Sequence, residues 1–275
     1  MGKVSKIVIR LFLILITIWF VYPIIWNVFA SLKTNTEILE SPWSLPTSLH
    51  FENFVRAFTK AHMGEYIFNS IFVTVFSMIL MLIITIPTAY AIARFNFFGK
   101  KFLHNFYMAG LFIEPLYILV PLFMLMSDMH MLDNLFWLSV VYAVGHVPFS
   151  VYLLIGFLKT IPKEYEESAS IDGCGYFSTL IRIILPIAKP GILTVVIFQF
   201  FAFWNEYALA LVLIQTDAKK TIPVGLANLM EVQRFATDWG ALFAALVIVL
   251  VPTIVLYALT QKKLTEGMTM GGIKG

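Results

Sequence analysis

The stretch TIPKEYEESASIDGCGYFSTLIRIILPIAKPG, Thr160 to Gly191, decides how the rest of the chain is interpreted. It is a long polar interruption between strongly apolar segments, in a chain that is only 13% charged. Its acidic residues gather in its first half, as Glu164, Glu166, Glu167 and Asp172. An otherwise apolar chain therefore keeps an acidic element with helix-forming signals outside its apolar segments.

The composition on either side is that of an integral membrane protein. The chain is 60% hydrophobic and its mean hydropathy is +0.86, whereas average globular domains are less apolar. Six segments reach the roughly 20 apolar residues that a helix needs to cross a bilayer. Backbone groups cannot stay unpaired in lipid, so these segments are predicted to be helices. The predicted spans are Ile7–Leu32, Tyr66–Ala93, Phe102–Met126, Leu135–Leu158, Gly191–Gln215 and Gly240–Gln261.

The distribution of basic residues predicts the orientation. With the N-terminus inside, 13 of the 19 Lys and Arg residues fall on the inner side and 6 on the outer side, as the positive-inside rule requires. Both termini and the Thr160–Gly191 stretch are therefore predicted to be cytoplasmic. The basic residues are scattered, which argues against nucleic-acid binding. Cys174 is the only cysteine, so neither an internal disulfide nor a cysteine metal cluster is expected.

The opening stretch predicts two short helices joined by a tight turn. Pro162 suits the first turn of a helix, where its missing N–H is not needed, and the helix dipole favours the acidic residues that follow it. Asp172-Gly173 predicts a stop, because glycine adopts the left-handed conformation that ends many helices. A second helix is expected over about Tyr176–Ile184 and is expected to end before Pro186, since the residue before a proline is biased away from helix.

The first of these helices is predicted to contact another protein. The alternative is an amphipathic helix resting on lipid headgroups, but such helices usually carry Lys and Arg on their polar face. Anionic lipid would repel an acidic helix, so a partner with a basic cleft fits better. Ser168, Ala169 and Ser170 are small, and would let another protein's backbone approach closely.

This stretch resembles the EAA signature of ABC importer permeases, EAA-x3-G-x9-I-x-LP. The matching residues are Glu167-Ser168-Ala169, Gly173 and Ile183-x-Leu185-Pro186, with Ser168 in place of the first alanine. The resemblance implies an all-α membrane fold, the six-helix type I (MetI-like) permease core, as one domain over residues 1–275. It also implies that residues 160–190 form a coupling helix loop that docks on a cytoplasmic ATP-binding subunit. The residues implied in this coupling are Pro162, Glu164, Glu166, Glu167, Ser168, Ala169, Asp172, Gly173, Leu185 and Pro186.

The resemblance extends over the rest of the chain. Ser31-Leu32-Lys33-Thr34, Asn53-Phe54 and Thr237-Asp238-Trp239-Gly240 resemble family motifs in the outer loops. The cytoplasmic tail, residues 262–275, ends in a glycine-rich segment similar to the tail of maltose-importer-like second permeases. That likeness implies contacts of Gly271, Gly272 and Lys274 with the ATP-binding subunits.

Two carboxylates fall inside predicted spans. Glu114 lies midway along the third span and Glu206 midway along the fifth, where a charge costs about 2.5–3.5 kcal/mol. They are therefore expected to face a water-filled or protein-lined interior, or to be protonated. Gln199, Asn205 and Glu206 recur at i, i+6 and i+7, so they are predicted to share roughly one helical face and, with nearby aromatic rings, to form a wall for a sugar. The alternative is polar bonding between helices, worth about 0.6 kcal/mol per bond. The candidate pathway residues are Glu114, Gln199, Trp204, Asn205, Glu206 and Tyr207.

These features together predict a non-catalytic permease subunit of an ATP-driven sugar or oligosaccharide importer in a bacterial cytoplasmic (inner) membrane. The chain has no P-loop pattern, so ATP and Mg would be used by a partner and no cofactor or metal is expected here. The implied partners are a homologous second permease, two ATP-binding subunits, an extracytoplasmic sugar-binding protein that docks on outer loops such as Thr216–Trp239, the sugar and membrane lipid.

Two rival functions stay open on the sequence. An ion-coupled secondary carrier would show inverted repeats and broken helices at the membrane midplane, and would not need the acidic element. An intramembrane enzyme could use Glu114 or Glu206 as an acid or base, but no nucleophile and base accompany them.

Overall fold

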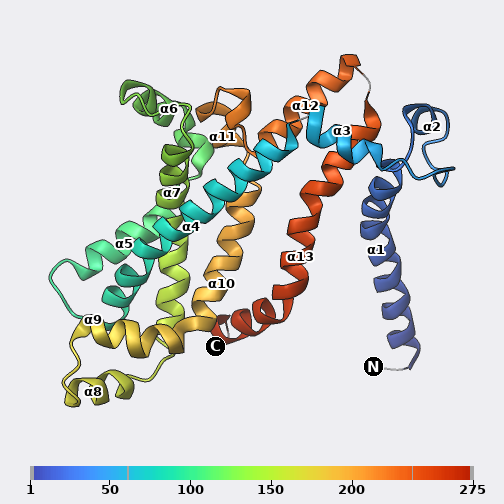
Figure 1. Cartoon of the computed structure of the whole chain (residues 1–275). Helices are drawn as coiled ribbons and strands as arrows, with labels where there is room; N and C mark the ends of the chain where they lie inside the picture. The colour runs from blue at the N-terminus through green and yellow to red at the C-terminus, as the bar shows by residue number, and fades with distance from the viewer. Residues whose placement is uncertain (1–2, 61, 237, 273–275) are drawn as a thin grey trace. The chain divides into compact units, whose positions relative to one another are not determined.

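The computed structural model describes residues 3–60, 62–236 and 238–272. Within these ranges the chain is helical and contains no strand (Figure 1). Five helices are long and apolar enough to cross a membrane, and one bent pair of helices would make a sixth span. The predicted all-α membrane architecture is confirmed.

One compact unit combines Met1–Tyr66 with Val224–Ile254. An 18-residue apolar stretch of its first helix has no buried residue, which suits a helix surrounded by lipid rather than water. Near the end of that helix the Trp26 ring lies 5.1 Å from the Phe243 ring, edge to face. The helices of this unit are α1 (Lys3–Ala30), α2 (Asn35–Glu40), α3 (Glu52–Lys60), most of α12 (Ile222–Ala236) and the first part of α13 (Trp239–Gly272).

The second unit combines Ile67–Pro223 with Val255–Gly275. Its centre is the pair α7 and α10, and α5 also packs on α7. Half of the apolar window of α7 is buried. The elements are α4 (Met63–Arg94), α5 (Lys100–Gly110), η1 (Pro115–Ile118), α6 (Leu119–Asp128), α7 (Leu135–Leu158), α8 (Glu164–Ile171), α9 (Tyr176–Thr179), η2 (Leu180–Ile184), α10 (Leu185–Trp204), α11 (Ala208–Leu213) and η3 (Asp217–Lys219).

Small residues let the central helices approach closely. A Cβ atom placed on Gly191 of α10 would lie 2.4 Å from the ring of Phe157 in α7. A Cβ atom on Gly110 of α5 would lie 2.9 Å from the Pro148 ring in α7. Both glycines are therefore required by packing, as is usual where membrane helices touch.

Three expected elements differ in the structure. The third span is not one helix, because α5 and the η1–α6 segment meet at an angle of 92°. The fifth span does not continue from Gly191 to Gln215, because α10 ends at Trp204 and α11 begins at Ala208. The second short helix does not end before Pro186 but continues through η2 into α10.

Candidate functional site

The acidic residues of α8 lie in its first turn, as the sequence predicted. The helix begins at Glu164, with Lys163 as its N-terminal cap, so Pro162 lies just before the helix and not in its first turn as expected. Glu164, Glu166 and Glu167 are the acidic residues of that turn. The partial positive charge of the helix N-terminus stabilises them.

The end of α8 is fixed by a left-handed glycine. Gly173 has φ +79°, and its N–H donates to the carbonyl of Ser170 at 3.1 Å. The N–H of Cys174 donates to the carbonyl of Ala169 at 2.9 Å. These paired bonds are a Schellman motif, which satisfies carbonyls that a helix end otherwise leaves unpaired. The prediction of a glycine stop is confirmed.

The exposed surface of α8 differs in one respect from the expectation. Glu164, Glu167, Ser168 and Asp172 are exposed. Ala169, however, is only 2% exposed and packs inside this chain. The expectation that a partner's backbone would approach at Ala169 is wrong, because the helix turns that side inward.

Glu166 is held by an ion pair that sequence reasoning missed. Its Oε1 lies 2.9 Å from Nε of Arg94 at the end of α4, and the two side chains are 18% and 5% exposed. The pair is close but not aligned as a hydrogen bond. Nη2 of Arg94 also donates to the carbonyl of Ile161 at 2.7 Å. Arg94 therefore holds two parts of the chain against α4. These are the segment before α8, through the Ile161 carbonyl, and the first turn of α8, through Glu166.

A continuous helical path connects α9 to α10. Leu185 precedes a proline yet has φ −60° and ψ −44°, and its N–H donates to the Leu180 carbonyl across the π turn η2. The residue before a proline is biased away from helix but is not excluded from it. Here the wider π turn lets Leu185 stay helical before Pro186. Leu185 faces an apolar groove of about 390 Å³ between α4 and the α9–α10 path. Pro186 is exposed.

A second site lies at the bend of the third span and just beyond the end of α10. A pocket of about 330 Å³ brings together Glu114, Glu206 and Tyr207, three of the six predicted pathway residues. His146 of α7 also lines it. Sequence reasoning could not place His146 here, because it is isolated along the chain.

The Glu206 carboxylate is anchored rather than free. Oε1 accepts from the N–H of Leu209 at 2.7 Å, and Oε2 accepts from the N–H of Ala210 at 3.1 Å. The hydroxyl of Tyr142 in α7 also donates to Oε2. The carboxylate thus satisfies the first N–H groups of α11 and ties that helix to α7.

The other three predicted pathway residues do not line this pocket. Gln199 is 1% exposed and its Nε2 donates to Ser150 Oγ at 3.0 Å. Trp204 is 4% exposed and its ring stacks on Phe200. Asn205 donates to the carbonyl of Phe201 at 2.9 Å. The shared face expected for Gln199, Asn205 and Glu206 does not form, because the helix ends before the last two.

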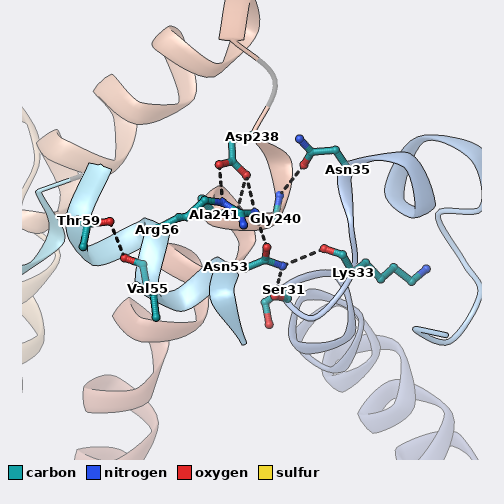
Figure 2. A network of polar contacts seen from close by, with 10 residues as sticks. All are labelled: Ser31, Lys33, Asn35, Asn53, Val55, Arg56, Thr59, Asp238, Gly240 and Ala241. Atoms are coloured by element: carbon teal, nitrogen blue, oxygen red, sulfur yellow. Dashed lines mark hydrogen bonds and ion pairs between the residues drawn. The ribbon is translucent and has the colours of Figure 1, made fainter. Parts of the chain in front are cut away.

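The network in Figure 2 joins motifs that lie far apart in the sequence. Nδ2 of Asn53 donates to the carbonyls of Ser31 at 2.8 Å and Lys33 at 2.9 Å. Arg56 donates to Asn53 Oδ1 at 2.5 Å and pairs with Asp238 at 2.9 Å. The end of α1, helix α3 and the start of α13 are thereby connected. The sequence singled out these motifs separately and did not predict that they meet.

Two other predictions concern the tail and metals. Gly271 and Gly272 lie in the last turn of α13, and Lys274 lies outside the described residues. Among the described residues, no group of three or more His, Cys, Asp or Glu is placed to hold a metal ion.

Residues 85–265 match the family described as "Binding-protein-dependent transport system inner membrane component". The chain is 36% identical over 264 residues to the probable ABC transporter permease protein YurM of Bacillus subtilis, which covers 96% of this chain and 87% of that protein. It is 34% identical over 259 residues to the diacetylchitobiose uptake system permease protein NgcG of Streptomyces coelicolor, covering 94% and 86%.

A solved structure shares the fold. It is a bacterial ABC transporter involved in the import of the acidic polysaccharide alginate, with a TM-score of 0.83 at 23% identity, covering 94% of this chain and 96% of that one. The broken third span is a feature expected of a secondary carrier, yet the family match and the acidic α8 element both favour the ABC permease. The chain belongs to the family of binding-protein-dependent transport system inner membrane components, the ABC transporter permeases.

Proposed function

We propose that this chain is the membrane-spanning subunit of an ATP-driven importer of sugars or oligosaccharides. Its relatives support this class, since one is named for the uptake of diacetylchitobiose. The chain would form half of the translocation pathway, with a homologous second permease forming the other half. An external binding protein would deliver the sugar to the outer loops. The excess of Lys and Arg on one side supports cytoplasmic termini.

Helix α8 is the proposed docking element for a separate ATP-binding subunit. The observation that carries this proposal is its geometry: a short helix with a fixed glycine stop, acidic residues in its first turn and an exposed polar side. Ile171 next to that stop is 87% exposed. An apolar side chain beside exposed carboxylates suits a partly basic, partly apolar cleft on another protein.

The partner subunits would do the chemistry. Two ATP-binding subunits would hold ATP and Mg and hydrolyse the nucleotide, and their closure would move α8. The α9–α10 path is continuous, so movement of α8 would be passed to the fifth span. The end of α13, including Gly271, Gly272 and Lys274, is proposed to contact the same subunits.

The docking proposal is tested by replacing Gly173 with valine. Because Gly173 has φ +79° and no atom lies within 4 Å of its would-be Cβ, the change acts through backbone strain of about 1–2 kcal/mol. We expect normal membrane insertion but less than a third of the wild-type amount of ATP-binding subunit in co-purification.

Gly175 provides the matched control. Its φ is −74° and its would-be Cβ also has no neighbour within 4 Å, so Gly175→Val introduces the same side chain without that strain. The assigned role of α8 would be contradicted if Gly173→Val retained the wild-type amount of ATP-binding subunit, or if both variants lost equal amounts of it.

A further inference from the structure

The segment that follows α2 presents an apolar surface. Residues 41–51, SPWSLPTSLHF, contain no Asp, Glu, Lys or Arg. Four of their large apolar side chains are between 60% and 72% exposed, namely Trp43, Leu45, Leu49 and Phe51. An apolar patch of this kind marks contact with another protein or with a membrane. The depth of the segment decides between these two.

The contacts of Trp43 show where the segment lies along α1. Its ring centroid is 6.2 Å from that of Tyr22, with the rings stacked, and 5.6 Å from that of Trp26. Both partners belong to the candidate membrane span Ser5–Ala30. At about 1.5 Å per residue, Tyr22 and Trp26 lie about 12 Å and about 6 Å before Ala30, the last residue of α1. The segment therefore folds back beside the membrane-crossing part of α1.

The length of the span places Trp43 at the boundary between hydrocarbon and lipid headgroups. The 26 residues of the span make a helix of about 39 Å, and the hydrocarbon core is about 30 Å thick. A centred, upright helix thus extends about 4–5 Å beyond the hydrocarbon at each end. Trp26 then lies near the boundary and Tyr22 within the hydrocarbon. Trp43 contacts both rings, so it lies at the boundary, where Trp and Tyr are enriched in membrane proteins.

Hydrogen bonds hold the segment at this depth. Nε1 of Trp26 donates to the Pro42 carbonyl at 2.8 Å. Lys33 is 1% exposed, and its Nζ donates to the carbonyls of Ser41 at 2.9 Å and Pro42 at 3.3 Å. The same Nζ donates to Ser44 Oγ at 3.1 Å, so all three of its donors are used. Backbone carbonyls at the edge of the lipid are thereby satisfied by this chain, as that position requires.

We propose that residues 41–51 are a membrane-interface anchor, with Trp43 and its neighbouring leucines resting among the headgroups and first methylene groups of the phospholipid around α1. An indole ring suits this position, because it has an apolar body and a polar N–H. The segment carries no fixed charge, so its insertion brings no ion into hydrocarbon. The cytoplasmic N-terminus proposed above would make this the outer leaflet, and the depth of the segment does not depend on that orientation.

The test measures the depth of a spin label in the complete transporter, in nanodiscs of phosphatidylethanolamine and phosphatidylglycerol. Cys174→Ser removes the only cysteine of this chain, and the other subunits are also made free of cysteine. Leu45→Cys or Leu49→Cys then places the label at an exposed position of the segment. Label collisions are recorded with molecular oxygen, which concentrates in lipid, and with a hydrated nickel chelate, which stays in water.

Asp128→Cys is the control, because Asp128 is an exposed, charged residue at the end of α6 and a label there should lie in water. Oxygen is apolar, so we expect the ratio of oxygen to chelate collisions at positions 45 and 49 to exceed that at position 128 by at least about threefold.

Two outcomes would overturn the proposal. Frequent chelate collisions, with the same ratio at positions 45, 49 and 128, would place the segment in water. Rare collisions with both reagents at positions 45 and 49 would show that another protein subunit covers the segment instead of lipid.

Discussion

The ion pair between Arg94 and Glu166 gives a quantitative prediction for Arg94→Ala. The change leaves the Glu166 carboxylate, whose side chain is 18% exposed, without its cation and removes the donor to the Ile161 carbonyl. Breaking a buried pair by removing one partner costs about 3–5 kcal/mol. Glu166 keeps some contact with solvent, so we expect the low end, about 3 kcal/mol. At 1.4 kcal/mol per factor of ten, local opening of α8 should increase about 100-fold.

Hydrogen exchange of the backbone amides of α8 measures this opening directly. Amides of residues 168–172 should exchange up to about 100-fold faster in Arg94→Ala, while those in the centre of α7 stay protected. Arg94→Lys keeps the charge but loses the planar fork that reaches two acceptors, so an intermediate rate is expected. Arg182→Ala removes an arginine from an exposed position in η2, and should leave α8 unaffected.

The reasoning would be refuted if α8 in Arg94→Ala exchanged within threefold of wild type. Equal acceleration in α7 would also refute it, because that would indicate global destabilisation rather than loss of a local anchor. Exchanging the two charges, with Arg94→Glu and Glu166→Arg together, should restore part of the protection that either single change removes.

Two further predictions concern packing and pH. Gly191→Ala should lower the free energy of unfolding by about 1–3 kcal/mol, because its Cβ would lie 2.4 Å from the Phe157 ring. Gly156→Ala is the control and should be neutral or stabilising, because no atom lies within 4 Å of its Cβ position. Thermal unfolding in detergent distinguishes the two variants. Asp133→Asn should cost about 2 kcal/mol at neutral pH, because it weakens charged hydrogen bonds. Burial raises the pKa of Asp133, but hydrogen bonds from Lys219, Thr216 and the Gln215 N–H outweigh burial and hold it below its usual range. A lowered pKa stabilises the fold above the unfolded value of about 4, so the difference between wild type and Asp133→Asn should be constant from pH 7 to 5 and shrink below that. A pH-independent difference would contradict the charged role of Asp133, and equal melting of the two glycine variants would contradict the packing argument.

Local features were the ones that could be predicted from the sequence. The glycine stop at Gly173 and the acidic first turn of α8 depend only on neighbouring residues, and both are present. The expectation for Pro186 failed for a local reason too, because a single π turn relieved the constraint. The shared face of Gln199 and Glu206 failed because it assumed a helix that continues past Trp204. The helical spacing of residues predicts a shared face only as far as the helix continues.

Contacts between distant segments could not be read from the sequence. Nothing near Arg94 along the chain indicates that it pairs with Glu166. Asn53 and Asp238 were noted in separate motifs, and only the structure brings both to Arg56 (Figure 2). Nothing near His146 along the chain indicates that it lines one pocket with Glu114 and Glu206.

The sequence by itself determined that this protein is a helical membrane protein with an acidic, glycine-terminated element outside its spans. Hydrophobicity, segment length and turn chemistry are properties of neighbouring residues, so they can be read from the sequence without knowledge of the tertiary structure. Only the tertiary structure decided which acidic side chain of that element is held by Arg94, which faces inward and which stay exposed. It also decided where the third span bends, where the fifth ends and that these two places lie together, because the pairing of distant backbone and side-chain groups depends on how the helices pack.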